Sequence, residues 1–112
     1  MKQIILDTSF IITCVKQKID FFEEISNEGM RILIPSQVIA ELKGLGAETA
    51  LKLLEKNDFD MVKISGKETD NSIITYAKKH PDVFVATLDK EIKDGFKGRV
   101  MIIRGKKKLE VI

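Results

Sequence analysis

Two hydrophobic periods alternate along the chain and predict strands and helices in turn. Six short apolar runs are typical of buried strands: 3–7, 31–34, 59–65, 83–89, 99–104 and 109–112. Between them, apolar residues recur at helical spacing in four stretches: 9–28, 36–45, 47–57 and 69–79. Strands separated by helices pair in parallel, because a helical crossover joins strands that point the same way. We therefore expect an α/β fold with three α/β/α layers around a central, mainly parallel sheet of about five strands.

Length and composition indicate a single domain over residues 1–112. Hydrophobic residues make up 44% of the chain and charged residues 32%, with no internal repeat or Pro/Gly/Ser linker. The one cysteine, Cys14, excludes an internal disulfide and suits a reducing compartment. No apolar run is long enough to span a membrane, and the opening "MKQIILD" begins a strand rather than a signal peptide. A cytoplasmic protein without membrane contact is expected.

Charge is distributed unevenly along the chain, whose net charge is only +2. Residues 93–112 carry a net charge of +5, whereas the other 92 residues carry −3. A basic end of this kind suits a polyanion such as RNA. The residues expected to contact phosphates are Arg104, Lys106, Lys107 and Lys108. A solvated strand edge explains the same lysines, and both interpretations stay open.

Four acids follow the predicted strands. Asp7 and Asp89 end the first and fourth strands, Glu41 lies in the helix after the second, and Asp70 opens the helix after the third. In an open parallel sheet, the carboxyl edge is where ligands bind. Structural roles are available for three of them: Asp70 as a helix N-terminal acid, Glu41 as an exposed helix acid and Asp89 as a turn residue. Nothing in its local sequence explains Asp7, which lies between two apolar runs.

Converging carboxylates repel one another unless a cation lies between them. Mg²⁺ and Mn²⁺ prefer oxygen ligands, and such ions support hydrolysis of phosphodiester bonds. We therefore predict a metal-binding and catalytic site formed by Asp7, Glu41, Asp70 and Asp89. Ser9 is placed to hydrogen-bond with the carboxylates or a bound water. Other chemistry is disfavoured, because His80 lies in the loop sequence "KKHPD" and Cys14 lies in an apolar helix.

Four sequence motifs contain these acids, and together they resemble a known family. In order, they are "ILDTSFII", "IPSQVIAELKGL", "TDNSIITYA" and "VATLDKEIK", spread over residues 3–93. The set resembles the PIN-domain nuclease family, and the tail "GRVMIIRGKKKLEVI" resembles its closing strands. The likeness is to small archaeal members similar to ribosomal-RNA-processing nucleases, and also to VapC-type toxins. The family usually has glycine-proline before the fifth strand, where this chain has Gly98 and Arg99.

The resemblance implies a metal-dependent ribonuclease that acts on single-stranded RNA. Asp7, Glu41, Asp70 and Asp89 match its acidic metal-site positions, Ser9 and Thr87 match nearby hydroxyls, and Glu91 matches an auxiliary acid. Partners implied are RNA, an antitoxin or RNA-processing assembly, and a second copy of the chain. The alternative is a non-catalytic RNA-binding or scaffold domain. A phosphoacceptor or phosphatase site is disfavoured, because a second aspartate would be needed where Ser9 lies.

Overall fold

The computed structural model describes residues 2–64, 69–96, 98–105 and 108–112, and within them all side chains except those of 69, 70, 90 and 91. The elements in chain order are β1 (Lys2–Leu6), α1 (Thr8–Lys16), α2 (Phe21–Asn27), β2 (Met30–Pro35), α3 (Ser36–Gly44), α4 (Glu48–Lys56), β3 (Asp60–Val62), α5 (Thr69–Lys79), β4 (Val83–Ala86), α6 (Lys90–Gly95), β5 (Val100–Arg104) and β6 (Lys108–Val111). None of the helices in these ranges combines the length and apolar character needed to cross a membrane.

The sheet has six strands in the order β3-β2-β1-β4-β5-β6. The first five are parallel, and β6 runs antiparallel to β5. The connection between β5 and β6 is too short for a crossover, so only antiparallel pairing is open to the last strand. The expected mainly parallel sheet is confirmed, with six strands instead of about five.

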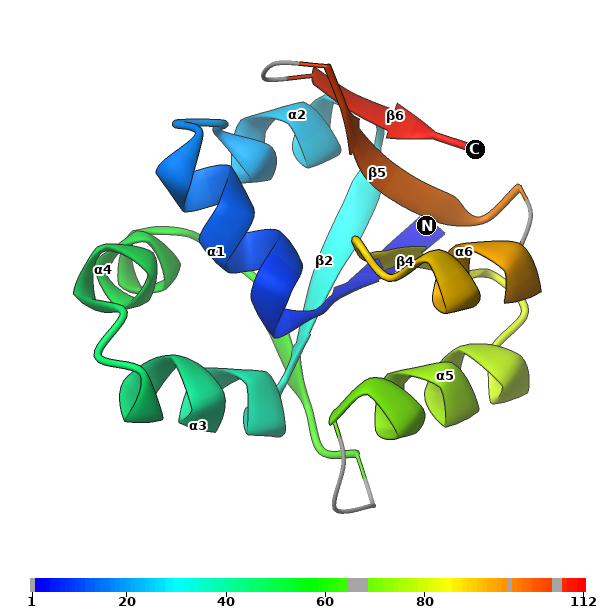
Figure 1. Ribbon diagram of the computed structural model, residues 1–112, viewed down its shortest axis with the longest axis horizontal. Coiled ribbons are helices and arrows are strands. Elements are labelled where there is room, and N and C mark those ends of the chain that lie inside the picture. Colours follow the sequence, from blue (N-terminus) through cyan, green and yellow to red (C-terminus); the bar gives the residue numbers. More distant parts are fainter. Residues whose placement is uncertain (1, 65–68, 97, 106–107) are drawn as a thin grey trace.

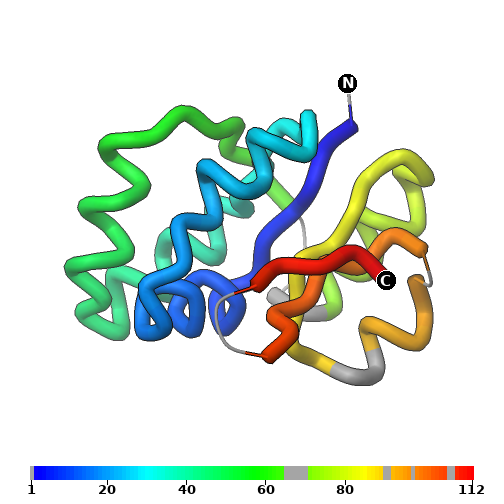
Figure 2. The backbone as a smooth tube through the Cα atoms, turned by 90° about the horizontal axis from the view of Figure 1, so that it is seen from above, coloured from blue at the N-terminus to red at the C-terminus, as the bar shows by residue number. Residues whose placement is uncertain are grey.

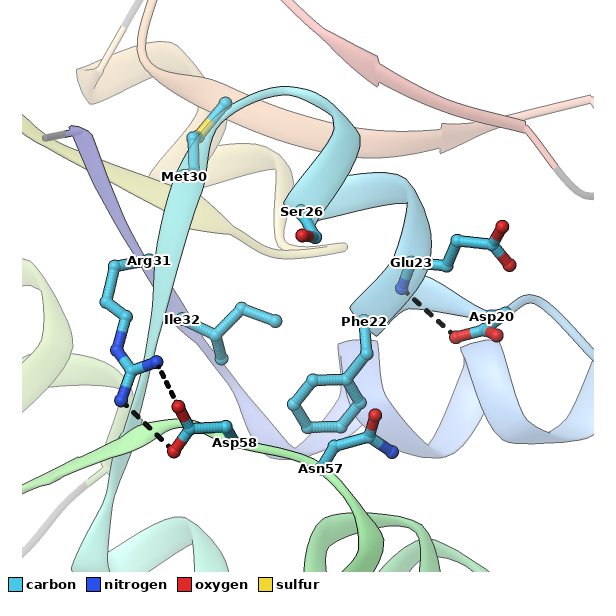
Figure 3. A pocket seen from close by; sticks show the side chains of 9 residues that line it. All are labelled: Asp20, Phe22, Glu23, Ser26, Met30, Arg31, Ile32, Asn57 and Asp58. Carbon is cyan, nitrogen blue, oxygen red and sulfur yellow. Dashed lines mark hydrogen bonds and ion pairs between the residues drawn. The ribbon is translucent and has the colours of Figure 1, made fainter.

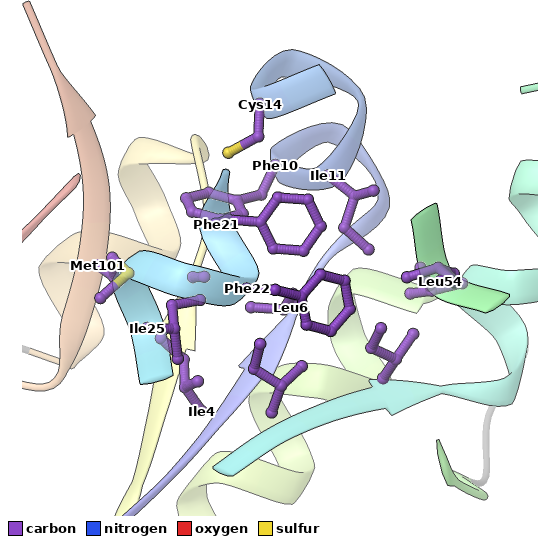
Figure 4. Packing of buried hydrophobic residues seen from close by; sticks show 14 of the residues in the cluster. Ile4, Leu6, Phe10, Ile11, Cys14, Phe21, Phe22, Ile25, Leu54 and Met101 are labelled. Carbon is purple, nitrogen blue, oxygen red and sulfur yellow. The ribbon is translucent and has the colours of Figure 1, made fainter. Parts of the chain in front are cut away.

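Alternation along the strands divides the core between the two faces of the sheet. Ile4 and Leu6 of β1 pack on one face with residues of α1, α2, α3 and α4, whereas Ile5 packs on the other with residues of α5 and α6. Figures 1 and 2 show these helices on opposite sides of the sheet. Aromatic rings fill much of the first face, where Phe10 and Phe21 are fully buried (Figure 4). The three-layer α/β/α prediction is therefore confirmed.

The single helix expected over 9–28 is wrong, because the chain forms α1 and α2 separately. Lys18 takes a left-handed conformation with φ of 58° just after α1, and this interrupts the helix. The side chain of Asp20 then accepts a hydrogen bond from the backbone N–H of Glu23 at 3.1 Å and starts α2. Both helices cover the same sheet face, so the apolar spacing continues across the break.

Other boundaries also differ from the sequence prediction, most of them by a single residue. The strands expected at 59–65 and 83–89 are shorter, since β3 and β4 end at Val62 and Ala86. The short helix α6 was not predicted at all. The early ends of β3 and β4 and the start of α6 all lie at the carboxyl edge of the sheet. This is the edge that carries the candidate site.

Candidate active site

The direction in which successive strands are added to the sheet reverses between β1 and β4. From β1 the chain adds β2 and then β3 on one side, and it returns to place β4 on the other side of β1. In a parallel α/β sheet, the carboxyl ends of the two strands at such a switch point enclose a ligand-binding crevice. Asp7 is the residue after β1, and Thr87 is the residue after β4. The switch point therefore brings together residues that are 80 positions apart in sequence.

Asp7 is buried, with 2% of its surface exposed, and both of its carboxylate oxygens are hydrogen-bonded. Oδ1 accepts from the backbone N–H of Phe10 at 2.7 Å and caps α1. Oδ2 accepts from the hydroxyl of Thr87 at 2.6 Å. Hydrogen bonds to an ionised acceptor are the stronger kind, so the carboxylate is fixed in position and orientation.

Thr87 links Asp7 to the start of α6. Its hydroxyl is fully buried and accepts from the backbone N–H of Asp89 at 3.0 Å while it donates to Asp7. The carbonyl oxygen of Asp89 in turn accepts from the backbone N–H of Lys93 at 3.1 Å, which begins α6. One hydroxyl thus joins the ends of two neighbouring strands. The side chain of Asp89 is exposed to solvent beside this link.

The remaining predicted acids lie on helices that start at the same sheet edge. The starts of α1, α3, α5 and α6 follow parallel strands, and Figure 1 shows those of α1, α3 and α5 close together in projection. Glu41 of α3 and Ser9 of α1 are exposed. Asp70 and Glu91 belong to α5 and α6, but their side chains lie outside the described part of the chain.

Asp7, Glu41 and Asp89 alone do not form a three-carboxylate metal site. Among the side chains that the structure describes, no group of three or more His, Cys, Asp or Glu residues could hold a metal ion. The predicted site also includes Asp70, outside that set. The donors placed at this edge are carboxylate and hydroxyl oxygens, which suit Mg²⁺ or Mn²⁺. In addition, the buried hydroxyl oxygen of Thr8, next to Asp7, has no hydrogen-bond partner among the described residues, which leaves polar capacity for water or a hydrated ion.

Two of the predicted RNA-contacting residues, Arg104 and Lys108, lie where β5 ends and β6 begins. Arg104 ends β5 and forms an ion pair with Glu110 of β6. Lys108 is exposed, whereas Lys106 and Lys107 lie outside the described residues. Because β5 runs parallel to β4, this end of the β5–β6 hairpin is at the same edge of the sheet as Asp7.

A separate cavity of about 400 Å³ lies at the opposite edge, where β2 begins (Figure 3). Arg31 on its wall donates to Asp58 at 2.8 Å and to Asp60 at 2.9 Å. The guanidinium of Arg31 lowers the pKa of both carboxyl groups and keeps them ionised. This ion-pair network ties β2 to the edge strand β3, and none of the predicted catalytic acids lines the cavity.

The prediction that Asp7 has no local structural role is wrong. The residue caps α1 as well as facing the switch point. The missed signal was the position of Asp7 directly before a helical apolar pattern, which is typical of an N-cap. The hydrogen bond from Thr87 could not be found by local pattern, because it joins distant segments.

Comparison with known proteins extends over nearly the whole chain. Residues 4–107 match the family model of the PIN like domain. The chain is 34% identical to Ribonuclease VapC4 of Methanocaldococcus jannaschii, over 99% of this chain and 97% of that protein. It is 35% identical to rRNA-processing protein fcf1 of Schizosaccharomyces pombe, over 80% of this chain but only 50% of that protein. The solved structure of the PIN domain endonuclease Utp24 superposes with a TM-score of 0.81 at 28% identity, and covers 98% of this chain and 92% of that one.

Proposed function

Since the chain belongs to the PIN-like domain family, we propose that it is a divalent-metal-dependent endoribonuclease that hydrolyses phosphodiester bonds in single-stranded RNA. The observation that carries the proposal is the buried carboxylate of Asp7, held at both oxygens where β1 and β4 end. Relatives named as a ribonuclease and an rRNA-processing protein, and a structural neighbour named as an endonuclease, support the choice of reaction.

Mg²⁺ or Mn²⁺ would be held by Asp7, Glu41, Asp70 and Asp89. Such an ion, when bound, activates a water molecule and stabilises the leaving oxygen. The chain's own part is to present its carboxylates without rearrangement. The helix cap and the Thr87 hydroxyl do this for Asp7, and the backbone hydrogen bond to Thr87 fixes the position of Asp89. Ser9 and Glu91 are proposed as supporting residues.

RNA carries negative charge, so a site rich in carboxylates needs cations near it. We assign this role to Arg104, Lys106, Lys107 and Lys108, whose hairpin projects from the same sheet edge. The ion pair with Glu110 already occupies Arg104 in part, so the neighbouring lysines supply most of the attraction.

The test is cleavage of an end-labelled, unstructured RNA by the purified chain, with Mn²⁺ or with EDTA. We expect cleavage only with the metal and its loss in Asp7→Asn. Glu48→Gln, which removes an exposed acid from α4, is the matched control and should cleave normally. Cleavage at the wild-type rate by Asp7→Asn would contradict the assigned site. RNA binding without any cleavage by the wild type would favour the alternative of a non-catalytic RNA-binding or scaffold domain.

Thr87 provides a second, finer test. Thr87→Val removes the hydroxyl but keeps the shape of the side chain, so the carboxylate of Asp7 loses one of its holding contacts. We expect kcat to fall by about tenfold or more while Thr87→Ser retains most activity, because misplacement of a catalytic group is costly. Equal activity of the two variants would show that the hydroxyl does not position Asp7.

The cellular setting is proposed from the two named relatives. One setting is a toxin-type ribonuclease controlled by an antitoxin, and the other is an RNA-processing assembly; a homodimer is compatible with both. We propose a cytoplasmic location, since Cys14 is the one cysteine of the chain and a chain that can form no internal disulfide suits a reducing compartment. Growth arrest on expression that depends on Asp7 would favour the toxin setting, whereas accumulation of unprocessed ribosomal RNA on depletion would favour processing.

A further inference from the structure

The outer side of α5 is polar and carries no acid beyond its first turn. Its exposed residues Asn71, Thr75, Lys78 and Lys79 lie on one side of the helix. From Asn71 to His80 the sequence contains no Asp or Glu. A polyanion that follows this side of α5 therefore meets only neutral or positive side chains from the described part of the helix.

Two stacked rings lie on the flank of the helix next to this surface, where Tyr76 and Lys79 are neighbours at i and i+3. The rings of Tyr76 and His80 lie with their centroids 4.0 Å apart and their planes inclined by only 20°. His80 Nδ1 lies 2.8 Å from the carbonyl oxygen of Tyr76, which restrains the imidazole further. Tyr76 is half-buried, whereas His80 is exposed. The pair thus presents a flat, ordered ring beside Lys79, with Lys78 on the outer side of the same turn.

Arg99 fixes the turn on which His80 lies. Its Nη1 donates to the carbonyl oxygens of Val83 at 2.8 Å and His80 at 3.3 Å, and its guanidinium lies 5.2 Å from the centre of the Phe96 ring. A positive charge at the carboxyl end of a helix is also favourable to the helix dipole. Asp82 is the acid in this turn, and Lys78, Lys79 and Arg99 outnumber it.

The length of α5 sets the distance between this surface and the candidate active site. The helix starts at the sheet edge that carries Asp7 and ends at the opposite edge, where β4 begins (Figure 1). Its 11 residues span about 16 Å, which corresponds to about five nucleotides of a stacked single strand. One RNA strand can therefore reach both places.

We propose that Tyr76, His80, Lys78 and Lys79 form an RNA subsite, the α5 subsite, about five nucleotides along the strand from the cleaved bond. A base stacks on His80, and the lysines contact the flanking phosphates. Stacking on aromatic rings with cations along the backbone is how proteins bind single strands without sequence preference. The ring stack favours RNA over an acidic peptide, which has no bases to place on it. The proposal rests on the proposed ribonuclease function, whose substrate it extends.

The test separates binding from cleavage. Affinity of the purified chain for a fluorescein-labelled 12-nucleotide oligouridylate is measured by anisotropy in EDTA at several salt concentrations. We expect His80→Ala to weaken binding by about tenfold and His80→Phe to retain it, because phenylalanine keeps the stacking face. Lys78→Ala/Lys79→Ala should reduce the slope of log affinity against log salt by about 1.4, since each phosphate contact on a single strand contributes about 0.7.

The control is Lys52→Ala/Lys56→Ala, which removes two exposed lysines from α4 and should leave affinity and salt slope near those of the wild type. Melting temperatures of all variants establish that they are folded. A 5-iodouridine placed in turn at each position of the oligonucleotide should photo-crosslink to Tyr76 or His80, and where cleavage is mapped the crosslinking position should lie about five nucleotides from the cleaved bond. Equal effects of the two lysine pairs, or a crosslink only elsewhere, would overturn the α5 subsite.

The outcomes also distinguish this proposal from the proposed function. RNA that crosslinks at Tyr76 or His80 but is never cleaved supports the subsite and contradicts the ribonuclease function. RNA that is cleaved normally by every variant, without a crosslink on α5, supports the function and overturns the subsite. Polyglutamate that displaces RNA from the wild type and from His80→Ala equally would show an unspecific basic surface, and this too overturns it.

Discussion

Asp7 serves stability and the candidate chemistry with the same two oxygens. One caps α1, and the other receives the Thr87 hydroxyl across the β1–β4 boundary. A backbone donor and a hydroxyl donor thus both hydrogen-bond to this buried carboxylate. Substitutions of Asp7 can therefore separate its two roles.

Asp7→Ala should destabilise the fold, whereas Asp7→Asn should change its stability little. Alanine removes the cap and leaves the buried Thr87 hydroxyl without this acceptor, at a combined cost of about 2–4 kcal/mol. Asparagine caps a helix about as well as aspartate, so we expect a change of about 1 kcal/mol or less. Urea unfolding followed by circular dichroism measures both. Equal losses of stability would show that the negative charge itself, rather than the cap, stabilises the fold.

Cys14 should be chemically inert in the folded chain. Burial, and then the negative charges of Glu24 and Asp7, raise the pKa of its thiol to about 12 from an ordinary value of 9.0. The thiol therefore stays protonated at pH 8, and iodoacetamide should modify it only after unfolding. Rapid alkylation of the native protein, followed by mass spectrometry, would contradict this.

The same shift makes the stability depend on pH at the alkaline end. Because the folded pKa is the higher one, the unfolded thiol loses its proton first as the pH rises above about 9. The free energy of unfolding should fall between pH 9 and 12, and less so in Cys14→Ala, which has no thiol to ionise. Denaturant titrations across this range provide the comparison. An identical pH dependence in the two proteins would assign the loss to other groups.

At the scale of elements, the break between α1 and α2 depends on one strained residue. Lys18 has a left-handed backbone that costs a non-glycine residue about 1 kcal/mol. We expect Lys18→Gly to stabilise the protein by up to about 1 kcal/mol, since glycine adopts this conformation freely. Lys52→Gly in the middle of α4 is the matched control and should cost about 1 kcal/mol. Destabilisation by both substitutions, in thermal or urea melts, would show that the turn does not need a left-handed residue.

Most elements of the fold could be predicted from the sequence, because apolar residues recur with the spacing of a helix or a strand in the segments that form them. The helix at 69–79 has the predicted bounds, and the parallel order follows from alternation of strands with helices. The α1–α2 break could not be predicted from spacing, since both helices bury the same face. Helix α6 has only six residues, and it follows a turn in which the backbone N–H of Asp89 donates to the hydroxyl of Thr87, a contact that local periodicity does not record.

The candidate site was predictable in part. The position of Asp7 at the end of a predicted strand was enough to place it beside the end of β4. Thr87 was identified only through the family resemblance. The place of Glu41 in the sequence of its helix does not predict whether its side chain lies near Asp7 and Thr87, because that depends on how α3 packs on the sheet. The placement of the four acids around a metal stays a prediction.

At the scale of the whole molecule, the basic hairpin should control how strongly binding depends on salt. Lys108 is exposed on β6, and with Lys106 and Lys107 it belongs to a segment of net charge +5. Replacing the three lysines by alanine should lower RNA affinity similarly for all sequences and reduce the salt slope by up to about 2. Anisotropy titrations measure both. An unchanged slope would identify the lysines as a solvated strand edge.

The pairing of β1 with β4 also governs when the proposed nuclease can first act during its synthesis. Asp7 is synthesised before Thr87, and the hydroxyl that holds it belongs to a residue made 80 positions later. β1 and β4 can pair only after β4 has left the ribosome. A growing chain whose Thr87 has not yet left the ribosome therefore lacks a complete candidate site, so the proposed ribonuclease would be inactive toward its own messenger RNA over that part of its synthesis.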